Sequence, residues 1–350
     1  MDLPEDSRVY TGENVRKNTN SLTRALGNYL SVMRPVEMQE ALRRIYWSSN
    51  RYQKLKYYRQ YKPKIDKLRT LYPPVILARN EMMRQNYHQS FLEFWQQKFG
   101  IPQEDYRLFL NKSGSVINYL NSLLPEPQDC PPSFGSKYNN RCFLCQIKSE
   151  GLKVPEDVLS FMGQKFPELK KRSQQIRIVF ADQSQMKPNP EDGSFIIEIN
   201  KNSGLPHQAA DLIHELSHVL RHLKGKQVLP ESTIYQREKE TIRLELTLLR
   251  EFSPSLWKAK FGVMLETYWR AFFEIESFTH PSSDLDRLYA KLFNRCFAGG
   301  HQAKNDLYLI NAPLIMQPFQ GLPAAVAYTI LLSEQIKDVV NDRVLETLRN

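Results

Sequence analysis

The stretch Ala209-Ala210-Asp211-Leu212-Ile213-His214-Glu215-Leu216-Ser217-His218-Val219-Leu220 is the most informative part of this 350-residue sequence. Its leucine, isoleucine and valine residues recur at helical spacing, which predicts a largely buried helix. His214 and His218 are four residues apart, so both imidazoles lie on one helix face and can reach one metal ion. Glu215, next to the first histidine, can take a proton from water at that metal. This H-E-x-x-H arrangement is typical of zinc hydrolases, although an amphipathic helix with surface His and Glu gives the same letters.

Two short apolar stretches upstream of this helix have the composition of β-strands. Residues 175–181 (QIRIVFA) and 193–200 (GSFIIEIN) are rich in isoleucine, valine and phenylalanine. Residues 184–190, which connect them, contain two prolines and read as a turn-rich loop. A strand before the motif helix can hold an extended substrate by backbone pairing.

A third metal ligand is expected downstream, because zinc hydrolases generally use three protein ligands and leave one position for water. Residues 235–252 have a helical pattern in which Glu238, Ile242, Glu245 and Leu249 share one face. Glu238 is the first candidate for the third ligand, and Glu245 is a supporting residue or the alternative ligand. A solvated helix face is the simpler alternative for either glutamate.

The remaining sequence predicts a mainly α protein, a helical zincin-like fold with a small β-sheet before the motif helix. Residues 20–123 are expected to be helical, with breaks near 62–63, 72–74 and 100–102, and a further helix is expected over 155–173. The expected organisation is a basic helical N-terminal region, a loop or linker, and a zincin-like catalytic domain, over residues 1–123, 124–152 and 153–350.

Composition favours a globular cytoplasmic protein. Hydrophobic residues make up 41% and charged residues 25% of the chain. No long uncharged apolar run predicts a transmembrane helix, and the acidic N-terminus lacks the apolar region of a secretory signal. The four cysteines, Cys130, Cys142, Cys145 and Cys296, do not form a disulfide framework at this length and are expected to be reduced thiols. A structural metal at Cys130, Cys142 and Cys145 is the less favoured alternative, because no second C-x-x-C supplies a fourth ligand.

Positive charge is concentrated near the N-terminus. Residues 1–100 contain 18 Lys and Arg against 9 Asp and Glu, whereas the other 250 contain 30 against 29. Residues 43–69 interleave basic and aromatic side chains, a pattern that can bind nucleic acid, acidic peptides or anionic lipid. Solvated Lys and Arg with inward-packed tyrosines fit the same pattern. Nucleic-acid binding is therefore possible but not favoured, because no nucleic-acid motif accompanies the charge.

From about residue 195 to 340 the chain resembles the oligoendopeptidase F and thimet-oligopeptidase group of zinc metallopeptidases. Four segments carry the resemblance: the strand and motif helix, Glu238 with Glu245 and residues 248–252, the Phe- and Glu-rich stretch 268–276, and residues 313–319 followed by a helix from 324 to 340. The resemblance implies a mostly helical fold with a deep cleft and one zinc ion, held by His214, His218 and Glu238. It also implies that Glu215 is the general base and that short, unstructured peptides are the substrates.

Two departures from that group leave an alternative open. The segment between His218 and Glu238 is shorter than in the group and closer to that of thermolysin-like gluzincins. The group also has a His and several Tyr near its fourth segment, which stabilise the oxyanion, whereas this chain has Leu314, Met316 and Gln320 there. The alternative is a regulatory zincin-type protein, comparable to the ImmA/IrrE type, acting through a protein or nucleic-acid partner. The remaining oxyanion candidates are Tyr268, His301, Tyr308 and Tyr328.

Overall fold

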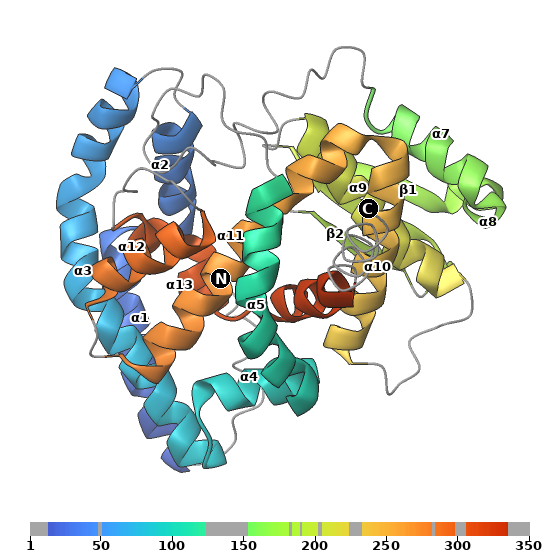
Figure 1. Cartoon of the computed structure of the whole chain (residues 1–350). Helices are drawn as coiled ribbons and strands as arrows, with labels where there is room; N and C mark the ends of the chain where they lie inside the picture. The colour runs from blue at the N-terminus through green and yellow to red at the C-terminus, as the bar shows by residue number, and fades with distance from the viewer. Residues whose placement is uncertain are drawn as a thin grey trace, which may run out of the picture. The chain divides into compact units, whose positions relative to one another are not determined.

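The computed structural model describes residues 13–47, 51–123, 153–181, 184–189, 191–201, 205–223, 233–281, 284–297 and 306–334 (Figure 1). These residues form two compact units. Unit 1 contains the described residues up to Lys98 and from Tyr268 to Leu322, and unit 2 contains those from Phe99 to Thr267 and 323–334. No helix in the described ranges is long and apolar enough to cross a bilayer. The predicted linker, 124–152, with Cys130, Cys142 and Cys145, lies outside the described residues.

Unit 1 is helical and has an aromatic core. The Tyr308 ring lies 4.9 Å from Phe273, 5.4 Å from Tyr289 and 5.6 Å from Tyr72, measured between centroids. Interlocking aromatic rings of this kind bury a large apolar area. The elements are α1 (Glu13–Val32), α2 (Pro35–Trp47), α3 (Arg51–Tyr87), α4 (Phe91–Phe99), the second half of α11 (Pro254–Thr279), α12 (Leu285–Cys296), η3 (Leu307–Ile310) and α13 (Ala312–Met316).

Helix α3 runs through two sites at which breaks were predicted, and those predictions are wrong. Pro63, Pro73 and Pro74 all lie inside this helix of 37 residues. Each proline removes one backbone hydrogen bond, which normally costs about 3 kcal/mol. The opposite face of α3 is fully buried at Ile65 and Leu68, among other residues. Burial of that face stabilises the continuous helix more than the prolines disfavour it.

Part of the basic charge in residues 43–69 is paired with carboxylates inside unit 1. Arg69 contacts Asp286 at 2.9 Å and Asp306 at 3.1 Å, and Lys62 lies 3.7 Å from Asp306. The Tyr58 hydroxyl donates to Asp306 at 2.8 Å, and Tyr58 is buried. These contacts account for several basic and aromatic residues as parts of the fold, while nucleic-acid binding by this stretch stays a prediction.

Unit 2 combines helices with a three-stranded sheet. Its α-helices are α5 (Gln103–Leu123), α7 (Glu156–Lys165), α8 (Pro167–Lys171), α9 (Leu205–Leu223), α10 (Ile234–Phe252), the first half of α11 and the helical residues 323–334. The single helix predicted over 155–173 is divided at Phe166, whose backbone is extended ahead of Pro167. Proline disfavours the helical conformation in the residue before it, which explains the division.

The sheet lies directly before the motif helix in sequence, as expected. Its order is β1 (Ile176–Ala181), β3 (Phe195–Asn200), β2 (Gln185–Pro188), with η2 (Ser173–Gln175) leading into β1. β1 and β3 are parallel, whereas β2 and β3 are antiparallel. β2 was predicted to be a loop, and that prediction is wrong. A strand ending in Pro188 is tolerated because β2 is at the edge of the sheet, where fewer backbone donors are needed.

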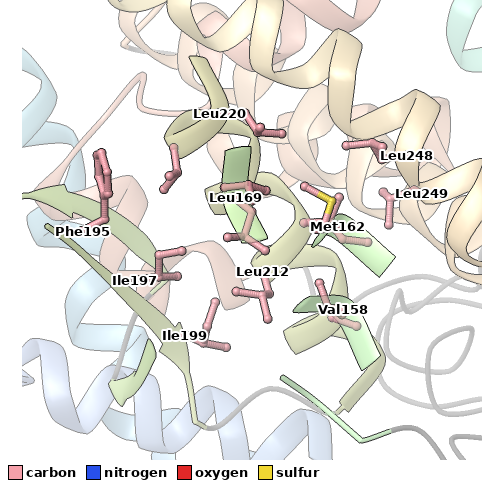
Figure 2. Close-up of a cluster of buried hydrophobic side chains, with 14 of the residues drawn as sticks. Val158, Met162, Leu169, Phe195, Ile197, Ile199, Leu212, Leu220, Leu248 and Leu249 are labelled. Carbon is pink, nitrogen blue, oxygen red and sulfur yellow. The ribbon is translucent and has the colours of Figure 1, made fainter. Parts of the chain in front are cut away.

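Helix α9 packs its apolar face on the sheet and on α7, α8 and α10. Alternate residues of β3, including Phe195 and Ile197, face a buried cluster that includes Leu212 of α9, Val158 of α7 and Leu249 of α10 (Figure 2). The core therefore fixes the rotation of α9 and determines which of its residues point away from the sheet. The predicted fold class, mainly α with a small sheet before the motif helix, is confirmed.

Candidate metal centre

Helix α9 presents His214 and His218 on the side facing α10. Leu212, Leu216 and Val219 of α9 are fully buried, whereas the His214 and His218 side chains are 21% and 17% exposed. The two rings lie 4.9 Å apart, nearly perpendicular at 82°. The four-residue spacing of the motif thus gives two neighbouring imidazoles that remain partly accessible to a ligand.

Helix α10 begins with a well-defined N-terminus only a few residues before Glu238. Thr233 forms a capping box with Gln236, in which each side chain accepts a hydrogen bond from the other residue's backbone N–H. Asp105 of α5 accepts hydrogen bonds from the Tyr235 hydroxyl and from Lys239 Nζ, the latter at 3.1 Å. These contacts hold the first turns of α10, so the position of Glu238 is closely determined.

A contact between α9 and α10 secures the same turn from the other side. Arg221 of α9 donates to the Arg237 carbonyl oxygen at 2.8 Å and forms an ion pair with Glu240 at 2.9 Å. Glu238 lies between these two positions in the sequence. Its carboxylate is consequently held opposite the two histidines of α9.

The side chains of His214, His218 and Glu238 converge on one point. Glu238 carboxylate oxygens lie 3.7 Å from His214 Nε2 and 3.4 Å from His218 Nε2. One ligand atom from each of the three residues lies within 4.8 Å of the others. Ligands 2.0–2.1 Å from zinc at tetrahedral angles are about 3.3 Å from one another, so the observed spacing and donor types fit a zinc ion.

The other nitrogen of each imidazole faces a buried residue of α10. His214 Nδ1 lies 3.0 Å from Glu245 Oε2, and His218 Nδ1 lies 3.0 Å from Thr241 Oγ1. Glu245 and Thr241 are both fully buried. Partners of this kind fix the ring orientation and tautomer of metal-binding histidines, leaving Nε2 for the metal. Glu245 therefore occupies the supporting position rather than joining the three converging groups.

Acidic groups around the histidines favour positive charge at this point. Burial lowers the pKa of His214, but Glu245, then Glu238 and Glu215, outweigh it and raise this pKa to about 9. Burial raises the pKa of Glu238, and its contacts with His218 and His214 outweigh this effect and lower it. A cluster that stabilises an imidazolium in this way also stabilises a divalent cation.

Glu215 differs from Glu238 and Glu245 in proton affinity, because its pKa is raised whereas theirs are lowered. Only 7% of the residue is exposed. Burial raises the pKa of its carboxyl group, and the neighbouring His214 and His218 reduce this rise without cancelling it. A buried carboxylate with a raised pKa beside two histidines is suited to accept and release a proton.

Two solved structures resemble this chain over nearly its whole length, although no protein-family model and no curated sequence matches it. The first is PZ peptidase A with an inhibitor, with a TM-score of 0.58 and 10% identity, over 95% of this chain and 70% of that one. The second, described as an oligoendopeptidase F, has a TM-score of 0.56 and 11% identity, over 94% of this chain and 68% of the other. The chain therefore has a fold found in peptidases. The likeness includes the N-terminal helices, which the sequence resemblance did not reach.

The oxyanion candidates named from sequence have different surroundings. In unit 1, Tyr268 is fully buried and Tyr308 donates its hydroxyl to Asp286 at 2.9 Å. His301 lies outside the described residues. Tyr328 belongs to unit 2, where it interacts with Lys260 and with the carboxylates of Glu245 and Glu238. Of these candidates, Tyr328 alone is shown beside the three converging residues within their own unit.

The described cysteine, Cys296, is a buried free thiol.

Sequence reasoning missed Thr241 and Lys260, which complete the surroundings of the histidines. Thr241 lies three residues after Glu238 and four before Glu245, so helical spacing places it between them and the position was recognisable. Lys260 of α11 forms an ion pair with Glu245 at 2.5 Å. It lies in another helix, and nothing in the spacing of the motif indicates it.

Proposed function

We propose that this chain is a zinc-dependent metallopeptidase of the gluzincin type that hydrolyses short or unstructured peptides. The observation that carries the proposal is the convergence of His214, His218 and Glu238 with both Nδ1 atoms held by α10. The peptidase fold of the two similar structures supports the reaction class. A helix face that was simply solvated would have no need of buried partners for both histidines.

His214, His218 and Glu238 would hold the ion. When bound, zinc supplies a Lewis acid that acidifies water and polarises the carbonyl of the peptide bond. Glu215 takes the proton of the attacking water as the new C–O bond forms. It then delivers this proton to the nitrogen of the leaving amine as the C–N bond breaks. The position of Glu215, next in sequence to His214 and largely buried, suits both transfers, because the group must accept a proton and afterwards lose it.

Glu245 and Thr241 act on the histidines rather than on the substrate. With Nε2 directed to the metal, each Nδ1 carries the hydrogen and donates it to the α10 partner. The ionised Glu245 increases the electron density of His214, whereas the neutral Thr241 mainly fixes the orientation of His218. Both residues keep the ligand atoms in place before the ion binds.

The proposal is tested by metal analysis of the purified protein together with cleavage of a mixed peptide library. Wild type should contain about one zinc ion per chain and cleave peptides. Glu215→Gln should keep the zinc and lose at least about 100-fold in turnover, in line with the size of general acid–base catalysis. The matched control is Glu104→Gln, which changes an exposed carboxylate of α5 in the same unit and should behave as wild type.

Full activity of Glu215→Gln would contradict the role of Glu215. Zinc binding by wild type without cleavage of any peptide would contradict the proposed reaction and favour the regulatory alternative. Absence of zinc from wild type, under conditions in which the protein is folded, would exclude the proposed metal centre.

A further inference from the structure

Lys260 of α11 lies behind the proposed zinc site, with its ammonium group directed to the side of Glu245 that faces away from His214. Its Nζ is 2.5 Å from Glu245 Oε1, while the other oxygen of that carboxylate is 3.0 Å from His214 Nδ1. The Lys260 side chain is 11% exposed and the Glu245 side chain is fully buried. The three side chains form one continuous chain of contacts from α11 through α10 to α9.

A lysine so close to a cation site needs a reason, because a positive charge disfavours a second positive charge nearby. Four carboxylates gather around the two histidines: Asp211, Glu215, Glu238 and Glu245. A buried carboxylate without a counter-charge is strongly disfavoured. Lys260 supplies that counter-charge to Glu245 from the side opposite the metal ligands, so the carboxylate can stay in place when His214 is neutral and bound to the ion.

We propose that Lys260 is a positioning residue for the metal centre: it anchors the Glu245 carboxylate, which in turn orients His214 for zinc. This inference rests on the proposed zinc site. Lys260 contacts neither the ion nor the substrate in this role and acts only through Glu245. Lys260 has a second partner in Tyr328, a buried residue with which it forms a side-chain hydrogen bond.

A merely structural role for Lys260 predicts different measurements. A buried ion pair between α10 and α11 that only joined the helices would affect the unfolding temperature of the metal-free protein. It would leave zinc affinity unchanged in any variant that still folds. A positioning role predicts a loss of zinc affinity that depends on the presence of Glu245.

The test is a double-mutant cycle on the zinc dissociation constant, measured by competition with a chelating dye. Lys260→Met keeps the length of the side chain without its charge. It should weaken zinc binding by up to roughly 10- to 100-fold, the usual effect of losing the outer partner of a metal ligand, because Glu245 is that partner and is no longer anchored. Lys260→Arg should restore most of the affinity. The control is Lys258→Met, on the exposed side of the same helix, which should leave zinc binding unchanged.

The second half of the cycle shows whether Lys260 acts through Glu245. Glu245→Gln should weaken zinc binding by itself, and adding Lys260→Met to it should change the affinity by no more than about threefold, because interacting residues are non-additive. The visible absorption bands of the cobalt-substituted protein should shift in Lys260→Met and be restored in Lys260→Arg.

Three results would overturn the inference: wild-type zinc affinity in Lys260→Met, a full additional loss in the double variant, or unchanged cobalt bands. If Lys260→Met does not fold, the comparison of Glu245→Gln with the double variant still tests the inference, because a further large loss there would exclude action through Glu245. If the wild-type protein did not bind zinc, both the proposed function and this inference would be overturned. If the wild-type protein bound zinc and Lys260→Met bound it with the same affinity, only this inference would be overturned.

Discussion

Replacement of Thr241 by valine is a specific perturbation of the proposed metal centre, because it removes one oxygen atom and almost no volume. Thr241 Oγ1 lies 3.0 Å from His218 Nδ1, and the threonine is fully buried. With His218 bound through Nε2, valine leaves the Nδ1–H group without its partner. An unsatisfied buried donor costs about 1–3 kcal/mol, which corresponds to roughly a 5- to 150-fold loss of zinc affinity.

The assay is competition between the protein and a chelating dye for zinc, with the unfolding temperature of the metal-free protein as a check on folding. Thr241→Ser keeps the oxygen and should retain most of the affinity. Thr247→Val is the matched control, because Thr247 is exposed on the same helix and its hydroxyl donates to the Arg243 carbonyl. Wild-type affinity in Thr241→Val, or an equal loss in Thr241→Ser, would refute the role of the hydroxyl in orienting His218.

Two further predictions concern stability. Burial raises the pKa of Glu274 from its usual 4.5 to about 8, although a hydrogen bond from the Phe319 backbone opposes the rise. Between pH 4.5 and 8 the folded protein therefore keeps a proton on Glu274 that the unfolded protein has released. The free energy of unfolding falls as the pH rises through this range. Glu274→Gln should therefore unfold at a higher temperature than wild type at pH 8.5 and at a similar temperature near pH 5. Parallel curves of unfolding temperature against pH for the variant and wild type would disprove this. Leu216→Ala removes a fully buried side chain from the core beneath α9 and should lower the free energy of unfolding by about 2–5 kcal/mol. Denaturant titration measures this change, with Leu205→Ala as the control because Leu205 is 40% exposed. If Leu216→Ala lost no more free energy of unfolding than Leu205→Ala, the packing described would be contradicted.

The features predicted correctly from sequence depend on local patterns: β-strand composition for β1 and β3, and helical periodicity for α9 and α10. The spacing of His214 and His218, and of Glu238 and Glu245, fixes which residues share a face of α9 or α10 before any packing is known. The convergence of the first three then requires only that the two helices pack with those faces together. The buried cluster in Figure 2 produces this packing, and its apolar residues were also visible in the sequence.

The features that sequence reasoning missed depend on contacts between distant elements. The prolines of α3 are normally helix-breaking, and only the burial of the opposite face explains why the helix continues through Pro73 and Pro74. The strand β2 exists because β3 offers a pairing edge, and not because its own four residues favour a strand. Lys260 approaches Glu245 from a separate helix, so its role depends on how α10 and α11 pack against each other.

The anchoring of α10 by Asp105 has a consequence for how the metal site forms. The contact from Asp105 to Tyr235 joins residues 130 positions apart, and Lys239 reaches the same carboxylate. Closing so long a loop has an entropic cost that short-range helix formation does not, and contacts of this kind slow folding. A synthetic peptide spanning α9 and α10 would contain all three proposed ligands and both α10 partners of the histidines. It would nevertheless lack Asp105 of α5, together with the sheet that packs against α9 and Lys260 of α11, so it should bind zinc weakly.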